Sequence, residues 1–184
     1  LYWKFSKESL KGMTFIFQTG HGEAEHIPLL LVPLVIVSTW ITHLFGGSAG
    51  REGVAVQLGG AIAHTLGRRL KHLNQPRMFL VIGMAAGFGG LFQTPIAATF
   101  FAMEVLISGV ILYEALFPSL VAAFAASFTA HFCGLEKFQV TIPAFHSSSS
   151  IQVLKILLCC LSFGIVGGLF AFLLKNAKSF FAKK

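Results

Sequence analysis

The sequence contains little charge and no aspartate. Only 11% of its 184 residues are charged, all seven acidic residues are glutamate, and 55% of the residues are apolar. An ordinary soluble domain carries roughly 25% charged residues. Because a surface in water needs that charge, this composition excludes an ordinary soluble globular domain. It predicts an integral membrane protein instead.

Cysteine is also scarce. Cys133 stands alone, and Cys159 and Cys160 are adjacent within an apolar run, so we expect no disulfide framework. We interpret all three as small packing residues. The sequence has neither an initiator methionine nor a signal peptide with its cleavage site. These absences predict a fragment of a longer protein.

The 14 basic residues outnumber the 7 acidic ones and gather mainly at the ends of apolar runs. Three clusters lie at residues 4–11, 68–77 and 175–184. Such positions are typical of membrane topology determinants on the cytoplasmic side, and not of a face that binds nucleic acid. We therefore expect three cytoplasmic clusters, an external loop at residues 136–150, and no nucleic-acid partner.

Long uncharged runs indicate which segments cross the membrane. Residues 27–50, 115–135 and 156–174 are long enough to span a bilayer core of about 30 Å. Shorter runs between the first two are interrupted by glycine and proline, as in discontinuous helices that line transport sites, although ordinary bundles contain such breaks too. Pro33 is expected to kink the first long helix. The sequence thus predicts an all-α membrane fold with re-entrant and broken helices at residues 26–46, 53–70, 76–92, 94–108, 113–133 and 152–176.

The motif GGSAGREG, residues 46–53, places four glycines and two opposite charges where the chain should lie deep in the membrane. Glycines let several backbone amides point at one spot, and the following helix adds the positive end of its dipole. A cation site would instead require several carboxylates or rings of carbonyls. The motif therefore predicts an anion site formed by the amides of Gly50, Arg51, Glu52, Gly53 and Val54.

Glu52 places an anionic side chain at this predicted anion site. Its carboxylate could compete with a transported anion for the same amides, and protonation would release it, coupling proton movement to anion movement. Alternatively, Glu52 could form an ion pair with Arg51 that holds the turn. The residues alone leave both interpretations open.

Two segments carry a family resemblance. GGSAGREGVAVQLGG resembles the GREG motif of the chloride channel and transporter (CLC) superfamily, and GMAAGFGGLFQTPIAATFFAMEVL is similar to its next helix pair. The resemblance implies that Glu52 is the external gate and that the surrounding amides bind the anion. It also implies a homodimer through the segments matching 95–107 and 115–135. The family consists of two inverted halves, so the resemblance implies that this chain is an N-terminal-half fragment, with a further anion-contacting loop before Leu1 and a second half after Lys184.

The detailed motif indicates a branch within that family. THLFGGSAGREGVAVQ, with Val54 in place of the commoner proline, is similar to the bacterial fluoride/proton antiporters, and Val105 replaces the proton-transferring acid of many exchangers. This implies proton-coupled fluoride export by a multi-pass protein of the plasma membrane, with fluoride, protons and the lipid bilayer as partners. The alternatives are a chloride channel, a chloride/proton exchanger, or a fragment that transports nothing.

Other chemistry has less support in the sequence. An intramembrane enzyme using Glu52 with His43 or His64 would need a second polar cluster, which the helices lack. The HGEAEH segment, residues 21–26, puts its histidines on different helix faces, unlike a zinc-binding HExxH motif. Ser48 has no partner at the spacing of a hydrolase nucleophile. We therefore expect a protein that is not an enzyme and has no cofactor and no metal site.

Overall fold

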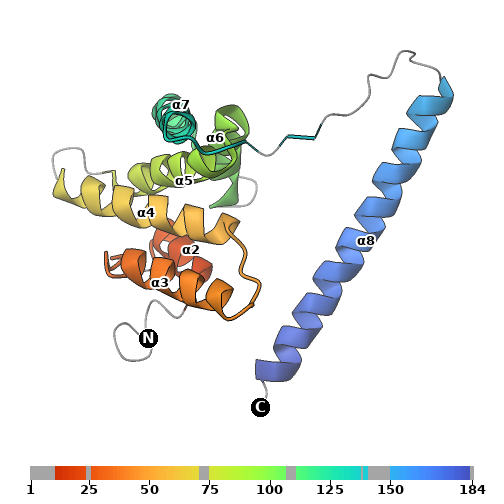
Figure 1. Ribbon diagram of the computed structural model, residues 1–184, viewed down its shortest axis with the longest axis horizontal. Helices are drawn as coiled ribbons and strands as arrows, with labels where there is room; N and C mark the ends of the chain where they lie inside the picture. The colour runs from red at the N-terminus through yellow and green to blue at the C-terminus, as the bar shows by residue number, and fades with distance from the viewer. Residues whose placement is uncertain are drawn as a thin grey trace. The chain divides into compact units, whose positions relative to one another are not determined.

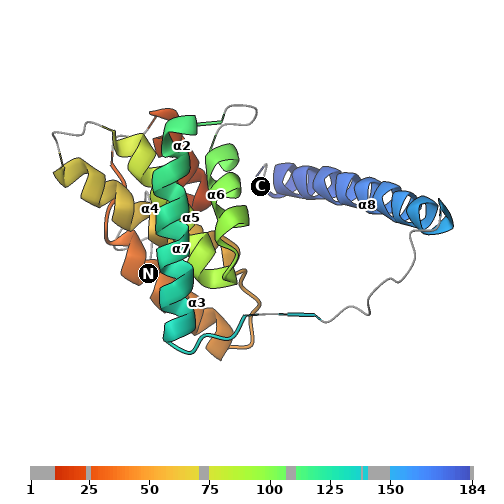
Figure 2. The same cartoon turned by 90° about the horizontal axis from the view of Figure 1, so that it is seen from above.

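The computed structural model describes residues 11–23, 26–70, 75–106, 111–137, 139–140 and 150–182. Within these ranges every regular element is a helix (Figures 1 and 2). The chain divides into two units, Leu1–Phe138 and Gln139–Lys184, which we describe separately.

The first unit is a stack of helices. Helix α3 packs on α4, α4 on α5, and α5 on both α6 and α7, while α2 lies against α4 (Figure 1). The order places α4 and α5 in the middle, and buried apolar side chains from α2 to α7 form one cluster around them. The bounds are α2 (Met13–His21), α3 (Leu31–Leu44), α4 (Glu52–Arg69), α5 (Pro76–Phe92), α6 (Pro95–Val105), the 3-10 turn η3 (Tyr113–Ala115) and α7 (Leu116–Phe132).

The contact between α4 and α5 joins backbone to backbone. A Cβ on Gly59 would collide with the carbonyl oxygen of Gly83, and one on Gly87 would collide with that of Ala55. Since lower numbers in α4 meet higher numbers in α5, the two helices run antiparallel. Glycine is required at these positions because the close approach leaves no room for a side chain.

Helices α5 and α7 run parallel and meet through small residues. A Cβ on Gly89 would lie 3.1 Å from the Cβ of Ala123, and one on Gly90 would lie 3.6 Å from that of Ala126. Ala123 is fully buried. These two alanines therefore pack against α5 within the subunit and not against a second copy. Ala125 on the same helix is exposed.

The expected helices do not include α2. Its buried residues, Phe15, Ile16, Thr19 and Gly20, recur with the period of one helix face, which is the signal in the sequence that indicates it. Ile16 contacts α4 near Gly60.

The first long apolar run contains a shorter helix than expected. α3 has 14 residues, a rise of about 21 Å, which is less than the bilayer core. It begins only at Leu31, so Pro33 lies in the first turn, where its missing N–H needs no partner. The expected kink at Pro33 is therefore wrong, because no full helical turn precedes it.

The second unit contains one described helix, α8 (Ser150–Ala182), 33 residues long. Within the described part of the chain, two helices are long and apolar enough to cross a membrane: Tyr113–Phe132 and Ser150–Ala177. The latter has a mean hydropathy of 2.5. Cys133, Cys159 and Cys160 are all exposed free thiols. Their interpretation as packing residues is therefore wrong within each unit, because no described helix of the same unit covers them.

Candidate anion site at the start of helix α4

The glycine-rich motif forms the turn between α3 and α4. Gly46 adopts a left-handed conformation (φ 76°), and the N–H of Gly47 donates to the carbonyl of Thr42 at 2.8 Å, which ends α3. A left-handed residue with this backward bond is a common helix stop, and glycine adopts it without strain. The motif thus reverses the chain and directs it into α4.

Three of the five predicted amides lie in the first turn of α4. The first backbone hydrogen bond of the helix runs from the N–H of Ala55 to the carbonyl of Arg51, at 3.0 Å. The N–H groups of Glu52, Gly53 and Val54 precede that bond, so the helix itself supplies no acceptor for them. Arg51 caps the helix without a side-chain hydrogen bond. Among the described residues these N–H groups have no acceptor, so this end of α4 presents unused donors together with the positive end of the helix dipole.

A second helix N-terminus lies beside the first. A Cβ on Gly53 would lie 3.4 Å from Cγ of Met13, and one on Gly12 would lie 3.9 Å from Nε2 of Gln57. Because Ile16 meets Gly60 further along, α2 and α4 run parallel with their amino ends together. The two dipoles add at this end. The chain thus places a second amide-bearing segment near the predicted site, in addition to any segment expected before Leu1.

The Glu52 side chain is exposed and folds toward the turn. Its Oε2 atom lies 3.1 Å from the position that a Cβ on Gly50 would occupy. A larger residue at position 50 would therefore displace the carboxylate. Among the described residues no ion pair joins Glu52 to Arg51, whose side chain lines a cleft instead. This geometry does not support an ion pair between Glu52 and Arg51 as the contact that holds the turn.

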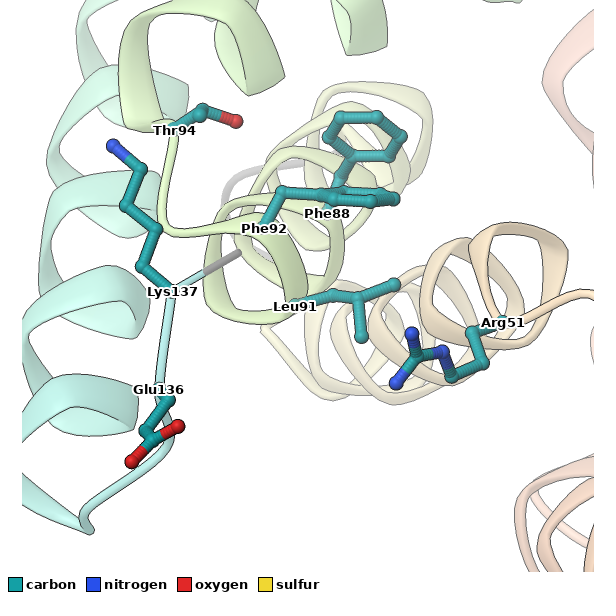
Figure 3. A pocket seen from close by; sticks show the side chains of 7 residues that line it. All are labelled: Arg51, Phe88, Leu91, Phe92, Thr94, Glu136 and Lys137. Carbon is teal, nitrogen blue, oxygen red and sulfur yellow. The ribbon is translucent and has the colours of Figure 1, made fainter. Parts of the chain in front are cut away.

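The cleft beside Arg51 has a volume of about 540 Å³. Figure 3 shows the apolar side chains of α5 between Arg51 on one side and Glu136 and Lys137 on the other. The sequence gives no direct signal for this cleft, since its two charged sides are more than eighty residues apart. Its lining residues are Arg51, Phe88, Leu91, Phe92, Thr94, Glu136 and Lys137.

The two histidines considered as catalytic partners do not form a site with Glu52. His64 is buried at the other end of α4, twelve residues from Glu52, a rise of about 18 Å. The exposed His43 ring lies 2.7 Å from the carbonyl of Thr39 through Nδ1. Across the described residues, no group of three or more His, Cys, Asp or Glu side chains is placed to hold a metal ion.

The comparison with known proteins identifies the family. The model of the voltage-gated chloride channel family matches residues 1–184. The crystal structure of a CLC-type fluoride/proton antiporter is 52% identical, with a TM-score of 0.87, over 93% of this chain and 43% of that one. The chloride/fluoride channel protein of Pseudomonas syringae pv. tomato is 38% identical over 162 residues, 87% of this chain and 36% of its own. The ClC-type chloride channel ClcB of Salmonella typhimurium is 32% identical over 98 residues, 53% of this chain and 22% of its own.

The fold and these matches define an all-α integral membrane protein. The chain belongs to the voltage-gated chloride channel family, which confirms the resemblance drawn from its two motifs. It spans less than half the length of the relatives described above.

Proposed function

We propose that this chain forms one wall of a CLC-type anion pathway that exports fluoride in exchange for protons, with Glu52 as the gate. The observation that carries the proposal is the parallel pairing of α2 and α4, whose amino ends meet at the turn bearing Glu52. Two aligned dipoles and several unused N–H groups attract an anion without a full positive charge. The bound ion therefore remains exchangeable.

Glu52 supplies the coupling to protons. When ionised, its carboxylate competes with the anion for the N–H groups of Glu52, Gly53 and Val54. When protonated, it loses that competition and the side chain swings away from the turn. Its exposure and its position over Gly50 leave room for this movement.

Val54 supports fluoride as the substrate. A proline at this position would have no N–H, whereas valine adds one donor to the first turn of α4. Fluoride is small and strongly hydrated, so a site that replaces its water needs more donors than a chloride site. The 52% identical structure is also that of a fluoride/proton antiporter.

A chloride channel or chloride/proton exchanger is the second candidate. The ClcB relatives support it, but they match a smaller share of the chain at lower identity. The name of the Pseudomonas relative contains both halides. The relatives therefore agree on anion transport, and the choice of fluoride over chloride rests on Val54 and the 52% identical structure.

We place the protein in the plasma membrane as a multi-pass homodimer. Arg68 and Arg69 end α4 and Arg77 opens the antiparallel α5, so the three cations share one end of the stack, as expected for a cytoplasmic side. On α6 and α7, large apolar side chains remain exposed after the alanines have packed inward, and they suit lipid or a second copy. These are Ile96, Phe100, Phe117, Val121, Phe124, Phe128 and Phe132.

The test is Glu52→Gln in a full-length CLC protein that carries this segment, reconstituted in liposomes. Fluoride efflux is measured with and without a proton gradient and normalised to folded protein. Glutamine copies the shape of the protonated acid but cannot titrate. We expect proton-driven fluoride movement to disappear while the amide-built site remains.

Glu114→Gln is the matched control, because Glu114 is an exposed carboxylate in η3, remote in sequence from the turn. It should leave coupling unchanged. Proton-driven fluoride movement that persists in Glu52→Gln would overturn the gating role. Coupling to chloride and not to fluoride in the unmodified protein would favour the second candidate.

A further inference from the structure

The cleft beside Arg51 has no part in the proposed gating role of Glu52. Its floor is apolar, made by Phe88, Leu91 and Phe92 at the end of α5. Charges stand only at its sides: Arg51 at the start of α4, and the Glu136–Lys137 segment that follows α7 (Figure 3).

A side chain from α5's end joins the backbone of α7's end in holding the second charged side. Nε2 of Gln93 donates to the carbonyl of Leu135 at 2.6 Å, across 42 residues of sequence. The N–H of Leu135 also donates to the carbonyl of Ala130 at 3.1 Å, so two bonds anchor the residue that immediately precedes Glu136 and Lys137. Gln93 also adopts a left-handed conformation (φ 53°), which residues other than glycine rarely take. The turn therefore keeps an unfavourable backbone conformation while making this bond.

The charges of the cleft remain available to a ligand. Arg51, Glu136 and Lys137 are exposed, and within the described ranges no ion pair joins them. Two cations and one carboxylate leave the cleft with a net positive charge. Low-dielectric walls concentrate the field of such charges and raise the local concentration of counter-ions. Because Arg51 is adjacent to Glu52 in the chain, the cleft opens beside the start of α4.

We propose that this cleft collects small inorganic anions from the aqueous phase and delivers them to the start of α4. Lys137 and Arg51 attract the anion, and Glu136 weakens their hold so that the ion moves on. Gln93 is a positioning residue, because it fixes the segment that carries Lys137. The proposal rests on the proposed function, since it supplies the anion that the Glu52 gate admits.

The first test measures how fluoride efflux depends on fluoride concentration in neutral-lipid liposomes, using a full-length CLC protein that carries this segment. Lys137→Gln should raise the half-saturating fluoride concentration several-fold at about 0.01 M ionic strength, where charges act over about 30 Å. At about 1 M of an impermeant salt, where this length falls to about 3 Å, the difference should disappear. Gln93→Ala should reproduce the effect although Lys137 is intact.

Lys155→Gln is the matched control, because it removes the same charge from α8 in the other unit. It should not change the half-saturating concentration. An unchanged value in Lys137→Gln at low salt, or a change that high salt does not remove, would overturn the proposal. If the unmodified protein shows no proton coupling that depends on Glu52, the proposed function is overturned instead. The salt-dependent effect of Lys137 is measured separately, so the two failures can be told apart.

A second test needs no transport and uses the present chain. Leu91→Trp, with Trp3 and Trp40 changed to Phe, places one fluorescent side chain on the floor of the cleft. Lys137→Gln should lower quenching by iodide several-fold at low ionic strength and leave quenching by neutral acrylamide unchanged. Equal iodide quenching with and without Lys137 would show that the cleft does not concentrate anions.

Discussion

The α4–α5 pair and α8 show opposite ways in which a helix of this protein is built. α4 and α5 meet so closely that a Cβ on Gly59 or Gly83 would collide with the partner backbone. α8 is longer and contains a window with a mean hydropathy of 2.5, yet none of that window is buried within its unit, and its glycines face open space. A long apolar window therefore marks the candidate spanning helix, whereas small residues mark the helices that pack against one another.

The largest expected effect is at the α4–α5 contact. Gly59→Ala should lower the free energy of unfolding by about 3 kcal/mol, the upper end of the usual cost of overpacking, because the added methyl meets backbone that cannot rotate away. Thermal unfolding in detergent measures the loss. Gly164→Ala on α8 is the matched control, since nothing lies within 4 Å of its added Cβ, and it should not destabilise the protein. Equal melting temperatures would show that the two helices do not touch.

The next effect concerns insertion of α8 into the membrane. Phe163 lies near the middle of the apolar window Ser150–Ala177. Phe163→Lys should make the apparent free energy of insertion less favourable by about 3 kcal/mol, because lysine is strongly disfavoured at the centre of a spanning helix. Glycosylation mapping in microsomes measures it. Ile151→Lys, near the end of the helix, should have a much smaller effect because the side chain reaches the interface. Similar losses at both positions would count against α8 as a spanning helix.

The smallest effect concerns a buried hydroxyl in the packed unit. Ser119 on α7 is fully buried, and its Oγ has no hydrogen-bond partner among the described residues. Ser119→Ala removes a desolvated polar group with little change in volume, so it should stabilise the protein by about 1 kcal/mol. Thermal unfolding against Ser127→Ala, a less buried serine on the same helix, checks this. Destabilisation by Ser119→Ala would mean that the hydroxyl has a partner after all.

The sequence predicts the class of fold well because composition and uncharged runs act locally. The expected ranges 53–70 and 76–92 overlap α4 and α5. The sequence did not predict α2, because this helix is only nine residues long and follows charged residues. The start of α3 was misplaced because proline is tolerated in a first turn and disfavoured later, and a sequence does not say where the turn begins.

The sequence likewise predicts one part of the candidate site and not the other. The amides after Gly50 follow from a contiguous motif, and the sequence alone points to them. The pairing with Met13 and the cleft at Lys137 depend on contacts between distant segments. The bond from Gln93 to Leu135 spans 42 residues, and no local pattern indicates it.

The backbone contact between α4 and α5 also limits which motions the proposed gate at Glu52 could use. Because Ala55 and Gly59 are pressed against α5, a slide or tilt of the first turn of α4 would have to break this backbone contact. The motion left to the gate is rotation of one exposed side chain, which takes picoseconds to nanoseconds, whereas collective helix movements take microseconds to milliseconds. Opening and closing would then be far faster than proton arrival. Protonation of Glu52, and not a conformational change, would then be the rate-limiting step of gating.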